Sequence, residues 1–279
     1  MIPLQIVFQR SVKSAFYAGF KKALDLHGND VDKAEAWLNS QAQSNGWEKA
    51  VKLQNRATQN GLIGIISNGN VGVMVNCETD FVSRNQTFRE LVTFCTNTLY
   101  STCLAQSSAT DENKVTFNSD QLTRLETSSG DSKSLADYLA FNIGKIGENI
   151  LIRRGVALYS KSLFQKVAAG IHPKATDDSV ALGKYGSLIL IEEKDLPSES
   201  AKDIELDVSD FPRLLCQHVI GMNPRIIKSR EGENATAAEE DILYQQEFVA
   251  NPAYSVGELV EKLNYEVHHF VRYECGEQS

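Results

Sequence analysis

The five cysteines are the residues of this 279-residue sequence whose chemistry is considered first, because a thiol can attack a substrate, bind a metal or form a disulfide. They lie at positions 77, 95, 103, 216 and 275 and form no CxxC pair and no dense Cys/His cluster. This spacing fits neither a zinc ribbon nor a disulfide framework, and indicates free thiols in a reducing compartment. Cys77 with a distant histidine such as His218 could form a nucleophile and base, so a thiol enzyme stays open as one alternative.

Other catalytic motifs are missing from the sequence. It contains no GxGxxG, GxxxxGK[ST], HExxH or GxSxG segment. The sequence therefore encodes no phosphate-binding loop, no metalloprotease helix and no serine-hydrolase turn of the familiar kinds. We expect that the chain is not an enzyme, that it binds no metal or cofactor, and that it binds no nucleotide by itself.

Composition narrows the class of partner. Hydrophobic residues make up 42% of the chain and charged residues 23%, the balance of a soluble protein that can bury real cores. The 28 basic and 36 acidic residues give a net charge of -8, which disfavours direct binding to nucleic acid. No apolar run approaches the roughly 18 residues of a membrane helix, so we expect no membrane partner and favour a protein or a small molecule.

Residues 76–85, with the sequence NCETDFVSRN, are the segment least typical of a plain core. They follow an apolar strand and precede a helix, and such junctions often carry binding residues at the edge of a scaffold. Two interpretations remain open at this point. Either Thr79 or Asp80 caps a helical turn while Phe81 packs inward, or Phe81 is exposed and takes part in binding.

The N-terminal region has two possible interpretations. Residues 1–24 are basic and contain no acid, which is typical of an organelle import segment but also fits a plain first helix. Gly28 and Asp30 then stand where one helix ends and the next begins, and apolar spacing predicts a helix over 31–43. We expect an import-like start with a partial ubiquitin-associated-like helical domain over 1–45, followed by a helical linker over 46–60.

A first core subdomain is expected over 61–162. Two apolar strands flank Asn68-Gly69, a strong hairpin signal. Helical spacing follows over 86–103, and a further helix and strand are expected at 133–145 and 150–159. Residues 105–133 are polar and are expected to form a mobile surface insertion.

A second core subdomain is expected over 163–279. Strands are predicted at 167–172, 185–191 and 265–273, and one predicted helix has an apolar face formed by Phe211, Leu214, Leu215, His218, Val219 and Met222. The order of strands and helix is similar in both halves, which suggests a degenerate duplication.

Several motifs together resemble those of one known family. NCETDFVSRN at 76–85 resembles the hallmark of elongation factor Ts, the guanine-nucleotide exchange factor of elongation factor Tu. The other motifs occur in the family's order: GLIG at 61–64, IGENILIRR at 146–154, GKYGSLILIE at 183–192, His218 with Met222, Asn223 and Pro224, and FVRYECGE at 270–277. The resemblance covers about residues 20–279 and looks closest to the mitochondrial branch.

The resemblance implies an α+β fold. A small ubiquitin-associated-like helical domain would precede two related core subdomains, each a small antiparallel sheet packed with helices. The first helix is atypical, because SVKSAFYAGF at 11–20 replaces the basic helix and turn with which the family begins.

The resemblance also implies a function. The chain would bind mitochondrial elongation factor Tu in its GDP state and promote GDP release in the mitochondrial matrix, after import directed by a transit peptide. Thr79, Asp80, Phe81 and Val82 would bind the partner and dislodge its magnesium ion. His218 and Met222 are candidates for secondary contacts, and the alternative for their helix, packing on its own sheet, is favoured over direct contact. The alternative from another class is a ubiquitin-associated-type protein-binding adaptor, which needs only the N-terminal helices.

Overall fold

The computed structural model describes residues 22–66, 70–107, 110–127, 134–174, 179–194, 204, 207–228 and 238–277. Within them, helices and antiparallel strands alternate along the chain, which confirms the α+β class. Residues 1–21 of the expected import segment lie outside the described residues. The Asn68-Gly69 turn lies outside them as well.

The helices and strands have the following bounds. The helices are α2 (Val31–Leu53), α3 (Asp80–Ser83), α4 (Gln86–Gln106), α5 (Ser119–Thr123), α6 (Leu135–Ile146), α7 (Phe211–Met222) and α8 (Val256–Lys262), with short 3-10 turns η2 (Val208–Asp210), η3 (Glu239–Asp241) and η4 (Leu243–Gln245). The strands are β1 (Asn60–Ile66), β2 (Val71–Cys77), β3 (Lys114–Asn118), β4 (Ile150–Leu158), β5 (Gln165–His172), β6 (Val180–Gly183), β7 (Tyr185–Glu193) and β8 (Tyr265–Glu274).

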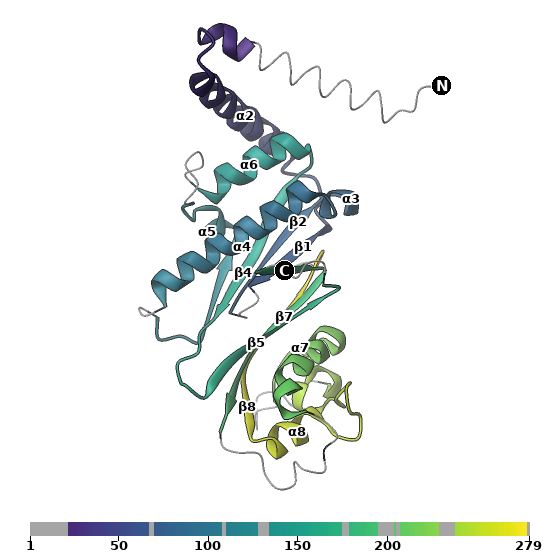
Figure 1. The fold of residues 1–279 in the computed structure, drawn as a ribbon. Coiled ribbons are helices and arrows are strands. Elements are labelled where there is room, and N and C mark those ends of the chain that lie inside the picture. Colours follow the sequence, from purple (N-terminus) through teal and green to yellow (C-terminus); the bar gives the residue numbers. More distant parts are fainter. Residues whose placement is uncertain are drawn as a thin grey trace, which may run out of the picture.

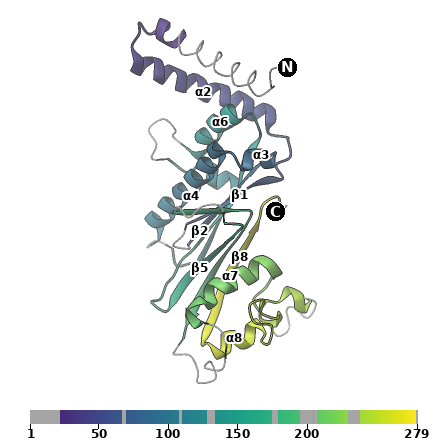
Figure 2. The ribbon, with the colours of Figure 1, turned by 45° about the vertical axis from the view of Figure 1, so that its right-hand side comes forward.

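The strands form two antiparallel sheets that pack face to face. The first has the order β3-β4-β2-β1-β6 and the second the order β5-β7-β8. Helices α4 and α6 cover the outer face of the first sheet, and α7 and α8 cover the outer face of the second (Figure 1). Figure 2 shows α2 lying across α6 at one end of the molecule and α8 at the opposite end.

Alternation along the strands produces these layers, because successive side chains of a strand point to opposite faces. In β1, Leu62 and Ile66 belong to the core under α4, whereas Ile63 and Ile65 face the second sheet. The hydroxyl of Tyr273 donates to the carbonyl of Gly72 at 3.0 Å and joins the two sheets. The predicted pairing of the strands on either side of the hairpin is confirmed, with Leu62 opposite Val75.

The predicted polar insertion is structured over much of its length, so the expectation of a mobile segment over 105–133 is wrong for those residues. Strand β3 pairs with β4, and Val115 lies opposite Ala157. Helix α5 begins with a capping box formed by Asn118 and Gln121. Leu122 of α5 is fully buried in the core of the first sheet, which anchors this otherwise polar segment.

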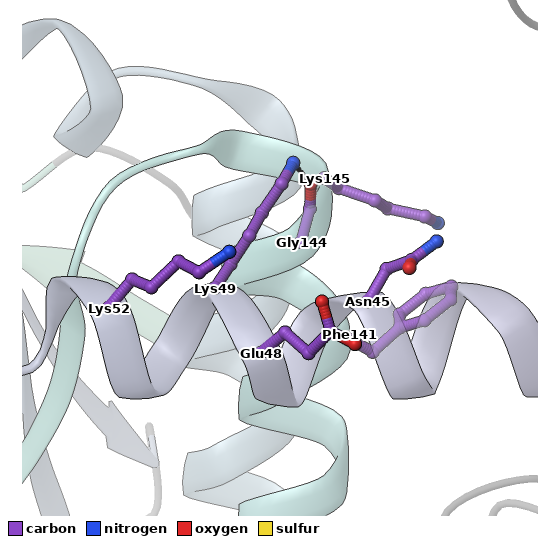
Figure 3. A pocket seen from close by; sticks show the side chains of 7 residues that line it. All are labelled: Asn45, Glu48, Lys49, Lys52, Phe141, Gly144 and Lys145. Atoms are coloured by element: carbon purple, nitrogen blue, oxygen red, sulfur yellow. Dashed lines mark hydrogen bonds between the residues drawn. The ribbon is translucent and has the colours of Figure 1, made fainter.

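The expected boundary near residue 45 falls inside one helix. Helix α2 continues without a break from Val31 to Leu53. Gly46 lies where α2 crosses α6, and an added Cβ there would overlap the carbonyl oxygen of Ala140. The side chain of Lys49 donates to the carbonyl of Gly144 at 2.8 Å, beside a hollow between the two helices (Figure 3). The first half of the expected linker is therefore packed on the core.

Strand β6 crosses the expected boundary between the two halves. It lies within 163–279, yet it pairs with β1 of the first sheet, with Leu182 opposite Gly64. Its side chains Val180 and Leu182 belong to the core under α4. The two halves are therefore interleaved along the chain.

Candidate partner-binding site

The segment singled out in the sequence forms a tight turn that presents one aromatic ring. Strand β2 ends at Cys77, and Thr79 caps the four-residue helix α3 by accepting a hydrogen bond from the Val82 amide at 3.3 Å. Phe81 is 80% exposed, whereas Ser83 is buried and Val82 packs partly against the core. The expectation of a cap at Thr79 is confirmed, and the inward-packed interpretation of Phe81 is wrong. Figure 1 shows α3 at the side of the molecule, beyond the ends of β1 and β2.

Two carboxylates hold the base of this turn from opposite sides. Glu148 accepts hydrogen bonds from the Thr79 amide at 3.0 Å and from the Thr79 hydroxyl at 2.6 Å. In return, Glu78 accepts from the Asn149 amide at 2.6 Å. Each carboxylate thus reaches from its own segment to the backbone of the other, and hydrogen bonds to charged groups are stronger than neutral ones.

Further contacts fix the ends of α3. Asp80 pairs with Arg84 at 3.1 Å, with both side chains open to solvent. Such an exposed pair contributes little to stability, so the Asp80 carboxylate stands beside Phe81 as a surface charge. Lys184, between β6 and β7, donates to the hydroxyl of Ser83 at 3.1 Å. Helix α3 is therefore tied to both halves of the core, with its exposed ring pointing away from them.

Cys77 does not have the surroundings of a nucleophile. The residue is fully buried, and burial raises the pKa of its thiol to about 12, with the nearby Glu148 charge acting in the same direction. Its Sγ donates to the Thr79 carbonyl at 3.2 Å. Reactive cysteines have a lowered pKa and some exposure, so this geometry speaks against the thiol-enzyme alternative.

His218 and Met222 of α7 differ in exposure. His218 is only 1% exposed, and its Nδ1 accepts from the Val249 amide at 3.3 Å while its Nε2 lies 2.8 Å from the Gln246 side-chain oxygen. Nδ1 therefore carries no proton, and burial lowers the pKa of the imidazole. The burial of His218 agrees with the packing role and not with direct contact to a partner. Met222, 44% exposed at the end of α7, is accessible to a partner.

Sequence reasoning found the motifs that contain Glu148 and Lys184 but missed their contacts with the candidate site. Glu148 lies 69 residues from Thr79 in the chain, and Lys184 lies 101 residues from Ser83. No local periodicity signals contacts of this range. Gln246, which holds the loop beside His218, was missed for the same reason.

The described part of the chain holds no group of three or more metal-ligating side chains that could bind an ion. Among the same residues, no helix is long and apolar enough to cross a membrane.

Comparison with known proteins identifies the family. The family described as Elongation factor TS matches residues 78–241, beginning inside the turn that carries Phe81. This chain belongs to the elongation factor Ts family. A second pattern, described as the N-terminal region of mitochondrial Elongation factor Ts, matches residues 16–48, so the family pattern includes part of the atypical start.

Individual members of the elongation factor Ts family are similar over almost the whole chain. Mitochondrial Elongation factor Ts of Aedes aegypti is 38% identical over 94% of this chain and 84% of its own length. The human protein of the same name is 38% identical over 94% of this chain and 79% of its own. The Nematostella vectensis protein is 37% identical over 92% of this chain and 94% of its own. The chain is therefore a translation elongation factor of the mitochondrial branch, located in the mitochondrion.

Proposed function

We propose that this chain is a guanine-nucleotide exchange factor, and not an enzyme, which binds mitochondrial elongation factor Tu in its GDP state and promotes GDP release. The observation that carries the proposal is Phe81, a large apolar ring held in solvent on a firmly anchored turn. Rigid aromatic side chains are the usual anchors of protein interfaces, and the fixed position of this ring distinguishes it from an exposed phenylalanine in a plain loop.

The geometry of the turn suits a wedge. Thr79 fixes the start of α3 and Val82 anchors it to the core, so the Phe81 ring enters a partner with little backbone freedom to lose. Asp80 adds a negative charge at the base of the ring. In this proposal the ring inserts into the nucleotide-binding domain of elongation factor Tu and the disturbance dislodges the magnesium ion that helps to hold GDP.

Thermodynamic linkage explains why such a wedge releases nucleotide. A factor that binds the nucleotide-free state more tightly than the GDP state shifts the equilibrium by its difference in affinity. The nucleotide then weakens binding of the factor by the same ratio. No covalent step is needed, and GTP can reload the emptied site.

Met222 is proposed as the secondary contact. It is exposed at the end of α7, and its carbonyl accepts from Gln246 at 3.4 Å, three residues before the exposed Val249. His218 serves this contact indirectly, because it binds the Val249 amide. Neither residue is expected to affect GDP release as strongly as Phe81.

The experiment that tests the proposal is release of fluorescent GDP from mitochondrial elongation factor Tu, followed by stopped flow. We expect Phe81→Ala to slow release at least about tenfold, since about 1.4 kcal/mol of lost differential binding gives that factor. Asp80→Ala should slow release less, because solvent partly replaces a peripheral charge.

Phe164→Ala is the matched control, because Phe164 is also an exposed phenylalanine, at 64%, but lies in the loop before β5. It should leave GDP release unchanged. Equal rates for Phe81→Ala and the unaltered protein, or equal slowing by both variants, would refute the proposal.

Import into the matrix is proposed from the acid-free, basic start of the chain. Residues 1–25 fused to a reporter should direct it to the mitochondrial matrix, as expected of a transit peptide. A fusion that stays in the cytosol would contradict this part of the proposal. The ubiquitin-associated-like character of the N-terminal helices is likewise proposed, on the turn at Gly28 and the cap at Asp30.

A further inference from the structure

We infer that Glu148 is a positioning residue for exchange, which holds the Phe81 ring in its binding orientation through Thr79. The inference rests on the proposed function, because it assigns Glu148 a task in the nucleotide exchange proposed above. Glu148 contacts the turn through both carboxylate oxygens, with the Thr79 amide at 3.0 Å and the Thr79 hydroxyl at 2.6 Å.

Helix α3 needs such support because it is too short to form by itself. It contains four residues, and a single helical turn fixes several backbone angles for very few hydrogen bonds. Its most prominent side chain adds little, since Phe81 is mostly in solvent. The conformation of the turn therefore has to be imposed by its neighbours.

The Glu148 contact also determines how Thr79 caps the helix. The Thr79 hydroxyl has one proton, and it donates that proton to Glu148. Its lone pairs are then free to face the Val82 amide, which donates to the same oxygen at 3.3 Å. Without the carboxylate, the hydroxyl could rotate and the cap would weaken.

Glu148 is itself held in place. It follows Gly147, which ends α6 in the left-handed conformation with φ of 84° and donates to the Ile143 carbonyl at 2.8 Å. On the other side, Asn149 is fixed through its amide to Glu78 and through its side chain to the Arg56 carbonyl at 2.8 Å. Helix α6 therefore supplies a rigid base to which Thr79 is attached.

The first test is Glu148→Gln, which keeps the size of the side chain but removes one acceptor oxygen and the charge. We expect GDP release from mitochondrial elongation factor Tu to slow about tenfold, the factor that corresponds to ordering about one backbone residue on binding. The Val82 amide should exchange its hydrogen faster in this variant, because its acceptor is no longer oriented.

The matched control is Glu258→Gln. Glu258 accepts from the Ser255 amide at 2.7 Å in the capping box of α8, so the same substitution removes the charge and one carboxylate oxygen at another helix cap, far along the chain from Phe81. This control should release GDP at the unaltered rate. A slow control would show that loss of a carboxylate at another helix cap has the same effect, and would overturn the inference.

The double variant Glu148→Gln with Phe81→Ala separates positioning from other roles. If Glu148 acts only through Phe81, the double variant releases GDP at the rate of Phe81→Ala alone. If the double variant releases GDP about tenfold more slowly than Phe81→Ala alone, the inference is overturned. An unaltered release rate for Glu148→Gln in the presence of Phe81 would overturn it as well. An unaltered rate for Phe81→Ala alone would refute the proposed function first, and the inference with it.

Thr79→Val serves as a second variant if Glu148→Gln does not fold. It removes the hydroxyl that donates to Glu148 and accepts from the Val82 amide, while the apolar side chain has a similar volume. The same loss of rate is expected, again only when Phe81 is present. A folded Thr79→Val variant with the unaltered release rate would overturn the inference.

Discussion

Phe81 and Phe88 are seven residues apart, yet truncating each to alanine should change the free energy of unfolding by very different amounts. Phe88 is fully buried in the core between α4 and the first sheet, whereas Phe81 is 80% exposed. A buried aromatic side chain removes about 150–250 Å² from water. Phe81 buries only about a fifth of its surface, so its truncation to alanine removes at most about 50 Å² of buried apolar area.

The expected free energies follow from these areas. At about 25 cal/mol per Å², truncating Phe81 to alanine costs about 1 kcal/mol at most, and less if the unfolded chain already buries part of the ring. Truncating Phe88 empties a packed site and costs about 3–5 kcal/mol. The two variants should differ by at least about 2 kcal/mol in their free energy of unfolding.

Urea denaturation followed by circular dichroism measures this difference. The transition midpoint of Phe81→Ala should lie close to that of the unaltered protein, and that of Phe88→Ala should fall well below it with a similar slope. Equal losses in both variants would mean that Phe81 is a core residue. The wedge would then be refuted, whatever the exchange rates.

Three further predictions concern the core. Leu122→Ala should destabilise the protein by about 2–5 kcal/mol in urea, because α5 is anchored by this fully buried side chain. Gly46→Ala should lower the melting temperature, because an added Cβ overlaps the α6 backbone, whereas Gly221→Ala meets no atom within 4 Å and should not. Burial lowers the pKa of His218 from 6.5, so its stabilising contribution is complete above about pH 6.5 and is lost as the pH falls towards the folded pKa. The urea midpoint should therefore drop less between about pH 7.5 and pH 5.5 in His218→Gln than in the unaltered protein.

Patterns with a regular period predicted the elements that build the layers. The face of α4 that includes Phe88 and Leu99 is buried as its spacing indicates, and the strands on either side of the hairpin pair as expected. The Asp30 cap accepts from the Lys33 amide as predicted. The spacing of apolar residues was sufficient to predict these helices and strands, because the residues of a buried face recur at a regular interval along the chain.

The missed elements were those whose stability depends on distant segments. Strand β3 is polar and only partly buried, and pairing with β4 is what makes it a strand. Two missed helices did have a local signal in the sequence. Asn118 and Gln121 form the capping box of α5, and Ser255 and Glu258 form that of α8. In the candidate site, the hallmark residues were found, but the Glu148 contact joins two turns that only the folded chain brings together.

The position of β6 has a consequence for how the chain can be made and divided. Until residues 180–183 join the first sheet, the outer edge of β1 presents unpaired amide and carbonyl groups, and such an edge invites pairing with other chains. A fragment ending at residue 162 would keep that edge open permanently and should aggregate. A chain entering its compartment amino end first must therefore keep β1 shielded until residues 180–183, near the start of the second half, have arrived, which makes assistance by a chaperone most valuable before that stage.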